Sequence, residues 1–369
     1  MNRLKNFLIV LLIVSTVIQT NILWLQNISR HNFFYKENDE QTPIDNYIAE
    51  NFKLEIKNEN GYFAIIYKPD EKIKNVTDGV LKEIFQNGKL ISKTNFDIES
   101  EIQKSTCVYD YDFFIDTDSF SKYLGLKSNS ISKFKTFNKI FFEGKNIIAF
   151  ADTLEKKLYR FQSENDFDFE NLAREQNYVY DKNLSPVENL YLPNVKINNP
   201  YEKNGDLLMN TIDEKLDCFF ENTTNKNVEN VNNILVFSSN ANIVKYYPEN
   251  ILEYASYQTG NKNSDLDSDY AAAISFIKKD ECTTNDVILK SYRQSDSQSE
   301  FYFDYLINNL PIEIENEPSI QNLLSVTVKN GTVAKYKKLA FNFISTQDFS
   351  AGKFKKYVYV GQNDFLSLH

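Results

Sequence analysis

Histidine serves acid–base and metal chemistry more often than any other residue, and this chain of 369 residues has two histidines. His31 follows an apolar segment near the amino terminus, and His369 is the last residue. Neither position suits a buried catalytic site, so Ser-His-Asp, Cys-His and His-ligated metal chemistry are not expected. No two of the ten glycines lie closer than nine residues, which excludes phosphate-binding loops and dinucleotide fingerprints. We therefore predict no metal and no cofactor.

Carboxylates are the other residues that could carry out catalysis. Cleavage of a glycosidic bond uses a pair of them. In a chain with 51 acidic residues such neighbours arise by chance, and alternate acids on a strand usually mark its solvated face. We expect a protein that is not an enzyme, with an extracellular carboxylate-dependent hydrolase of cell-wall glycan as the alternative. The candidate pairs come from two groups: Asp110, Asp112, Asp116 and Asp118, and Asp166, Asp168 and Glu170.

A third acidic group, Asp265, Asp267 and Asp269, resembles the start of a calcium-binding loop. Such a loop needs glycine at its sixth position and a glutamate at its twelfth. Tyr270 and Phe276 occupy these positions. We predict instead that the three acids complement the amino-terminal end of a helix.

The three cysteines, Cys107, Cys218 and Cys282, are too few and too widely spaced for a disulfide framework. We predict three buried, unreactive thiols. One disulfide is the alternative if the compartment is oxidising.

The amino terminus carries the strongest signal in the sequence. Residues 7–25 (FLIVLLIVSTVIQTNILWL) contain no charge, and a helix that crosses the hydrocarbon core needs about 20 such residues. A signal peptide has a shorter apolar core, of about 7–15 residues, and a small-residue cleavage site. The sequence LQNISRHNFFY that follows has no such site. We predict an uncleaved transmembrane helix, with Trp24 in the headgroup region at its far end.

Charge predicts the orientation of this helix. Residues 1–6 contain Arg3 and Lys5 and no acid, whereas the whole chain has a net charge of -10. Because basic flanks stay on the cytoplasmic side, we expect a short cytoplasmic stub and an acidic extracellular portion. The protein is therefore expected at the cell membrane as a single-pass protein. Its negative charge argues against nucleic acid as a partner.

Polar side chains gather on one side of the predicted transmembrane helix. At about 100° per residue, they fall within an arc of roughly 140°. One interpretation is a surface that contacts a partner helix, where each hydrogen bond contributes about 0.6–2 kcal/mol. The other is a weak anchor whose hydroxyls bond its own backbone. The partner-facing surface would comprise Leu12, Ser15, Thr16, Gln19, Thr20 and Leu23.

Beyond the transmembrane helix, the patterns predict an α+β ectodomain of two domains, each an antiparallel sheet with flanking helices. A proline cluster at 186, 193 and 200 marks the junction between them. The predicted segments are a cytoplasmic stub (1–6), the transmembrane helix (7–25), a stalk (26–45), an N-terminal domain (46–163), a linker region (164–200), a C-terminal domain (201–345) and a tail (346–369).

Asn-Gly pairs at 60–61 and 330–331 stand between apolar runs and predict two hairpins, 52–57 with 62–67 and 324–329 with 332–341. Apolar spacing predicts the remaining elements. The expected strands are 108–116, 139–142, 146–151, 157–162, 234–237, 243–247, 251–257 and 301–310, the expected helices are 77–86, 117–126, 206–220 and 265–277, and 222–233 is expected to be a loop.

Two regions together resemble the YycH/YycI family. The first is the terminus MNRLKNFLIVLLIVSTVIQTNILW, and the second is FYFDYLINNLPIEIENEP followed by LLSVTVKNGTVAKYKKLAF. The family consists of membrane-anchored accessory proteins of the WalK (YycG) sensor histidine kinase in low-GC Gram-positive bacteria. The YycH type is favoured, although members of that type usually continue well beyond the last hairpin.

The resemblance implies a regulator of a two-component system that acts by contact. Its expected partners are a sensor histidine kinase of the WalK type and a sister protein of the YycI type, and its output would be cell-wall metabolism. The resemblance transfers no catalytic or cofactor residue, and it assigns residues 7–25 as the surface that touches partner helices. Besides the hydrolase named above, a structural member of an envelope assembly remains the alternative.

Overall fold

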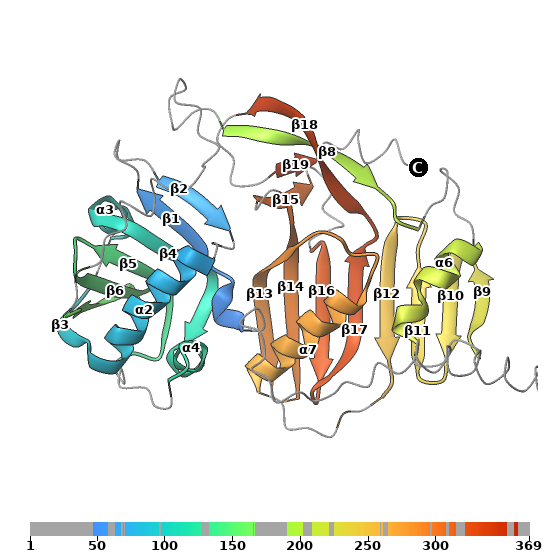
Figure 1. The fold of residues 1–369 in the computed structure, drawn as a ribbon. Coiled ribbons are helices and arrows are strands. Elements are labelled where there is room, and N and C mark those ends of the chain that lie inside the picture. Colours follow the sequence, from blue (N-terminus) through green and yellow to red (C-terminus); the bar gives the residue numbers. More distant parts are fainter. Residues whose placement is uncertain are drawn as a thin grey trace, which may run out of the picture. The chain divides into compact units, whose positions relative to one another are not determined.

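The structure is a computed structural model (Figure 1), and all of its described residues lie within Ile44–His369. The transmembrane helix predicted over 7–25 lies outside the described residues. Within the described part of the chain, no helix is long and apolar enough to cross a membrane. The described residues are 47–57, 63–67, 69, 71–95, 97–126, 133–164, 166, 190–201, 209–220, 225–258, 260, 265–295, 297–307, 310–314, 322–352 and 358–360.

The first sheet has seven strands in the order β2-β1-β4-β5-β6-β7-β3, and all neighbouring strands are antiparallel. Its hairpin β1–β2 and its meander β5-β6-β7 confirm the strands predicted there. The elements of this sheet are the single turn η2 (Ile48–Glu50), β1 (Lys53–Lys57), β2 (Phe63–Tyr67), α2 (Glu71–Asn87), β3 (Lys89–Asn95), α3 (Ile98–Lys104), β4 (Ser105–Asp116), α4 (Thr117–Tyr123), β5 (Thr136–Glu143), β6 (Ile147–Asp152) and β7 (Lys157–Gln162).

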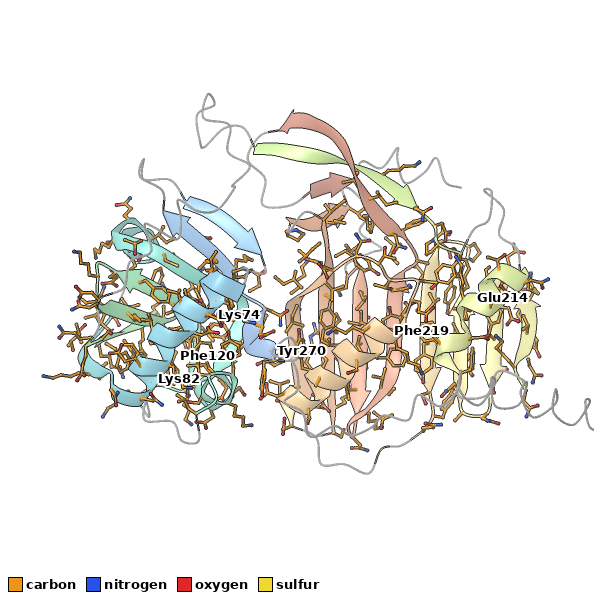
Figure 2. All side chains as sticks on the ribbon, viewed as in Figure 1. Lys74, Lys82, Phe120, Glu214, Phe219 and Tyr270 are labelled. Atoms are coloured by element: carbon orange, nitrogen blue, oxygen red, sulfur yellow. The ribbon has the colours of Figure 1, made fainter. Side chains whose placement is uncertain are left out.

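Helix α2 lies across one face of this sheet (Figure 1). It starts at Glu71, six residues earlier than predicted, because Ile73 extends the buried apolar face by one turn. Thr77 therefore lies inside the helix, and its hydroxyl donates to the Ile73 carbonyl at 3.0 Å. Phe85 of α2 contacts the ring of Phe120, labelled in Figure 2, so the core beneath the helix is aromatic.

The second sheet has ten strands. Its main path is β19-β15-β14-β16-β17-β12-β11-β10-β9, and β13 pairs with β14. Helix α7 (Leu266–Lys279) packs on β14, β16 and β17. The strands are β9 (Asn227–Val231), β10 (Ile234–Ser239), β11 (Asn242–Tyr246), β12 (Ile251–Ser256), β13 (Val287–Ser295), β14 (Gln298–Ile307), β15 (Leu310–Ile314), β16 (Leu324–Lys329), β17 (Thr332–Leu339) and β19 (Val358–Val360).

Two local predictions in this sheet are confirmed. Asn330 and Gly331 both have positive φ, 51° and 75°, as the tight turn of the β16–β17 hairpin requires. Asp265 caps α7, because its side chain accepts from the Ser268 amide at 3.0 Å. The acids of this segment therefore belong to a helix start. The described residues contain no group of three metal-binding side chains.

Other predictions were wrong in part. The loop expected over 222–233 contains β9, which pairs with the edge of β10. The strand expected over 301–310 ends at Ile307, and β15 folds back antiparallel on β14. The helix expected over 206–220 is described only from Met209, as α6 (Met209–Lys215), and the turn η3 (Asp217–Phe219) follows it. One strand pair, β15 with β19, is parallel.

A separate two-stranded ribbon joins distant parts of the chain. Strand β8 (Leu190–Asn198) lies in the segment predicted as a linker, and it pairs antiparallel with β18 (Asn342–Gly352). The α+β class with antiparallel sheets and flanking helices is confirmed apart from the one parallel pair. The division of residues 46–345 into two domains joined by a linker region stays a prediction.

Candidate functional site

The site predicted on the transmembrane helix cannot be followed in the structure. All of its residues lie before Tyr47, where the described residues begin. The partner-facing surface and the interface anchor therefore stay predictions. These residues are Leu12, Ser15, Thr16, Gln19, Thr20, Leu23 and Trp24.

The candidate catalytic carboxylates have structural partners. Asp110 forms an ion pair with Lys139, and Asp112 forms one with Lys53. Asp116 caps α4, because its carboxylate accepts from the backbone amides of the next turn at 3.1 Å. Of the second group, Asp166 is exposed, and Asp168 and Glu170 lie outside the described residues. The hydrolase alternative is therefore not favoured.

The cysteines are buried or half-buried, and none of the three is in a disulfide. Burial raises the pKa of the Cys107 thiol well above its ordinary value, and it raises the pKa of Cys218 to about 12. Burial also raises the pKa of Cys282. Two of the three cysteines are buried as predicted, and Cys218 is half-buried. Because the thiolate is the reactive form, these raised pKa values agree with the prediction of unreactive thiols, which stays a prediction.

A buried joint connects the two sheets, and Asn51 is its central residue. Its side-chain amide donates to the Tyr270 hydroxyl of α7 at 2.7 Å. Its side-chain oxygen accepts from the Leu289 amide of β13 at 3.0 Å. Asn51 is 7% exposed and Tyr270, labelled in Figure 2, is 2% exposed, so water competes little for these bonds.

Two further contacts extend this joint. The Tyr292 hydroxyl of β13 donates to the Phe114 carbonyl of β4 at 3.1 Å. The ring of Tyr292 meets the ring of Phe113 edge to face, with centroids 5.6 Å apart. Strand β13 and helix α7 thus contribute one side of the joint, and η2 and β4 contribute the other.

A cavity of about 440 Å³ lies beside Asn51 and is lined from both sides of the joint. Ligand pockets commonly fall between about 300 and 1,000 Å³. The cavity walls include the ion pair of Lys74 and Glu50, with side-chain exposures of 16% and 10%. The walls combine apolar side chains with polar and charged ones, Lys278 and Asp286 among them, so the cavity offers both kinds of contact to a ligand.

Asp78, on α2 one turn beyond Lys74, has an unusual environment. The Tyr123 hydroxyl donates to its carboxylate at 2.6 Å. Its other oxygen is buried without a hydrogen-bond partner among the described residues. Burial raises the pKa of Asp78 to about 6, against the opposing effects of Tyr123 and Lys74. Asp78 therefore changes charge close to neutral pH.

A second buried network lies where α7 ends. The Asp280 carboxylate accepts from Lys338 at 2.5 Å and from the hydroxyls of Tyr336 and Thr283 at 2.9 Å. The Cys282 amide donates to the other carboxylate oxygen of Asp280 at 3.1 Å. The Asp280 and Lys338 side chains are 0% and 2% exposed, so the network holds the end of α7 to β17 away from water.

The sequence analysis identified neither the joint nor the buried charged residues. Two of these residues, Asp78 and Lys338, could have been found from their positions in the sequence pattern. Asp78 lies on the apolar face of α2, between Ile73 and Leu81, where a charge is unexpected. Lys338 lies two residues after Tyr336 on β17, so both side chains are on the same, buried face of the strand. A charged residue at a position where the periodic pattern predicts a buried apolar side chain indicates a group that is paired or has a shifted pKa.

Removing the Asn51 side chain is expected to weaken the joint. Asn51→Ala leaves the Tyr270 hydroxyl and the Leu289 amide without these partners, at about 1–3 kcal/mol for each buried group. We expect the free energy of unfolding to fall by about 2–4 kcal/mol. Urea unfolding of the full chain measures it, and Asn95→Ala, at an exposed position of β3, is the control. Equal stability of the two variants would contradict the role of Asn51.

No family model matches the chain, and no curated protein sequence matches it. Among solved structures, the chain is similar to the crystal structure of YycH from Bacillus subtilis, at 10% identity and a TM-score of 0.48. The match covers 82% of each chain. With identity this low, a functional inference depends on the residues of the chain itself.

Proposed function

We propose that the chain is a membrane-anchored, non-enzymatic regulator of a two-component sensor histidine kinase that controls cell-wall metabolism. The observation that carries the proposal is the amino terminus: residues 1–6 precede 19 uncharged residues, 7–25, with polar side chains on one side. A signal that crosses the membrane through this segment would pass along the helix that residues 7–25 are expected to form.

The YycH resemblance of the two sequence regions supports a kinase of the WalK type as the partner, with a sister YycI-type protein beside it. Regulation by contact requires that the helix or the ectodomain binds the two kinase states with different affinity. Ser15, Thr16, Gln19 and Thr20 offer hydrogen bonds to a neighbouring helix inside the membrane. Such bonds depend on the rotation of the partner, so they can distinguish two helix arrangements.

Replacing Ser15, Thr16, Gln19 and Thr20 together with leucine tests this mechanism. If two of these residues bond a partner helix at about 0.6–2 kcal/mol each, the contact weakens roughly tenfold or more. We expect kinase-dependent transcription to approach that of a deletion strain, measured with a reporter at equal protein level.

The matched control replaces Val10, Val14 and Val17, on the opposite side of the same helix, with leucine. These changes keep the segment apolar and are expected to leave transcription unchanged. Unaltered transcription in the polar-to-leucine variant would contradict the helix contact. If deletion of the protein left kinase output unchanged, and the unaltered protein localised to envelope sites in the parent strain, a structural role in an envelope assembly would replace the kinase proposal.

A further inference from the structure

We propose that the cavity beside Asn51 binds a short extended peptide that has an apolar side chain and a free carboxyl terminus. This inference is independent of the kinase proposal, because it depends only on the walls of the cavity. Three features of those walls carry it: an apolar floor, an unpaired cation and the outer edge of a strand.

The floor of the cavity is apolar and comes from both sides of the joint. Phe52 follows η2, and Ile274 and Ile277 lie in the last turns of α7. These side chains are 1%, 7% and 5% exposed, and the small surface that they leave open lines the cavity. Burying an apolar ligand group there contributes about 25 cal/mol per Å² removed from water.

Lys278 is the cation available to a ligand. It is exposed in the last turn of α7 and lines the cavity, and within the described residues it forms no ion pair. Lys74, by contrast, is paired with Glu50. A carboxylate bound beside the apolar floor would therefore meet Lys278, which has no ion-pair partner among the described residues. The exposed carboxylate of Asp286 also lines the cavity.

The edge of β13 provides the backbone groups that a peptide requires. In the antiparallel pair with β14, the Asp286 carbonyl accepts from the Leu306 amide at 2.7 Å, and so faces β14. The Leu289 amide points the other way, to Asn51. Because backbone groups alternate along a strand, the N–H and C=O of Val287 also point away from β14, and Val287 lines the cavity.

Together these features match peptide recognition by strand addition. In that mode, backbone hydrogen bonds to a sheet edge give affinity, and pockets beneath alternate side chains give specificity. The peptide backbone would pair with Val287, its apolar side chain would cover Ile274 and Ile277, and its carboxylate would approach Lys278. A bound peptide would contact η2, α7 and β13 at once and would strengthen the joint at Asn51.

The test is titration calorimetry of the full chain in lipid nanodiscs with the tripeptide Leu-Leu-Leu and with its carboxyl-terminal amide. An ion pair at an exposed lysine contributes up to about 1 kcal/mol, so the free acid is expected to bind about fivefold more tightly than the amide. Lys278→Gln is expected to remove this difference. Lys279→Gln, the adjacent exposed lysine that does not line the cavity, is expected to preserve it.

A second variant tests the location. Thr284 is exposed and lines the cavity, so Thr284→Trp fills the space without altering the core. It is expected to abolish binding of both peptides while leaving the urea unfolding midpoint unchanged. Absence of binding to the unaltered chain at millimolar peptide, equal affinity for acid and amide, or undiminished binding by Thr284→Trp would each overturn the proposal. None of these outcomes bears on the transcription experiment.

Discussion

Replacing Lys338 with methionine is expected to lower the free energy of unfolding by about 3–5 kcal/mol. The reason is that the buried carboxylate of Asp280, which is 1% exposed, would lose its counter-ion. The hydroxyls of Tyr336 and Thr283 would still donate to the carboxylate, but they carry no opposite charge. Urea unfolding of the full chain, followed by circular dichroism, measures the loss.

Two further variants separate the buried charge from lost packing. Lys335→Met changes an exposed lysine of the same strand and is expected to alter stability by no more than about 0.5 kcal/mol. Asp280→Asn combined with Lys338→Met removes both charges, so we expect it to lose less stability than the two single changes added together. If the stability losses of the two single variants added up to that of the double variant, the ion pair would not be the cause of the loss. The same conclusion would follow if Lys338→Met were as stable as Lys335→Met.

Replacing Asp78 with asparagine is expected to stabilise the protein by about 2–3 kcal/mol at pH 7.5. Burial raises the pKa of Asp78 from 3.8 to about 6, so the folded protein disfavours the ionised form. Asparagine removes the charge, and its side-chain oxygen still accepts from the Tyr123 hydroxyl. Urea unfolding at several pH values compares this variant with the unaltered chain.

The sign of the pH dependence follows from the higher pKa in the folded state. Between about pH 4 and pH 6 the folded protein binds more protons at Asp78 than the unfolded chain does. The stability that Asp78 contributes by binding a proton in the folded state is fully present below pH 4. It is lost as the pH rises through 6, and stability then no longer changes with the protonation of Asp78. The gain from Asp78→Asn should therefore be large at pH 7.5 and small at pH 4.5. Asp166→Asn, at an exposed position, is the control, and an equal gain at both pH values would contradict the perturbed pKa.

Local signals in the sequence were sufficient for much of the secondary structure. The Asn330-Gly331 turn and the Asp265 cap each depend on a few consecutive residues, so they could be predicted without knowledge of the fold. The meander β5-β6-β7 was also predictable, because each of its strands pairs with its neighbour in sequence.

Elements that depend on distant partners were not predictable in this way. Strand β9 is Asn-rich, with the sequence NVENV, and forms because the edge of β10 offers hydrogen bonds. The joint was hidden for the same reason. The two partners of Asn51, Tyr270 and Leu289, lie more than two hundred residues further along the chain, and no local pattern links them.

The ribbon of β8 and β18 has a consequence for the order in which the protein forms. Between its two strands the chain contains β9 to β17, so β8 is synthesised long before β18 exists. Closing so long a loop costs conformational entropy, so we expect β8 and β18 to pair after the local hairpins have formed. During synthesis, β8 would therefore remain an unpaired strand with open edges, the kind of segment that chaperones protect. Closing the ribbon would be among the final steps of maturation.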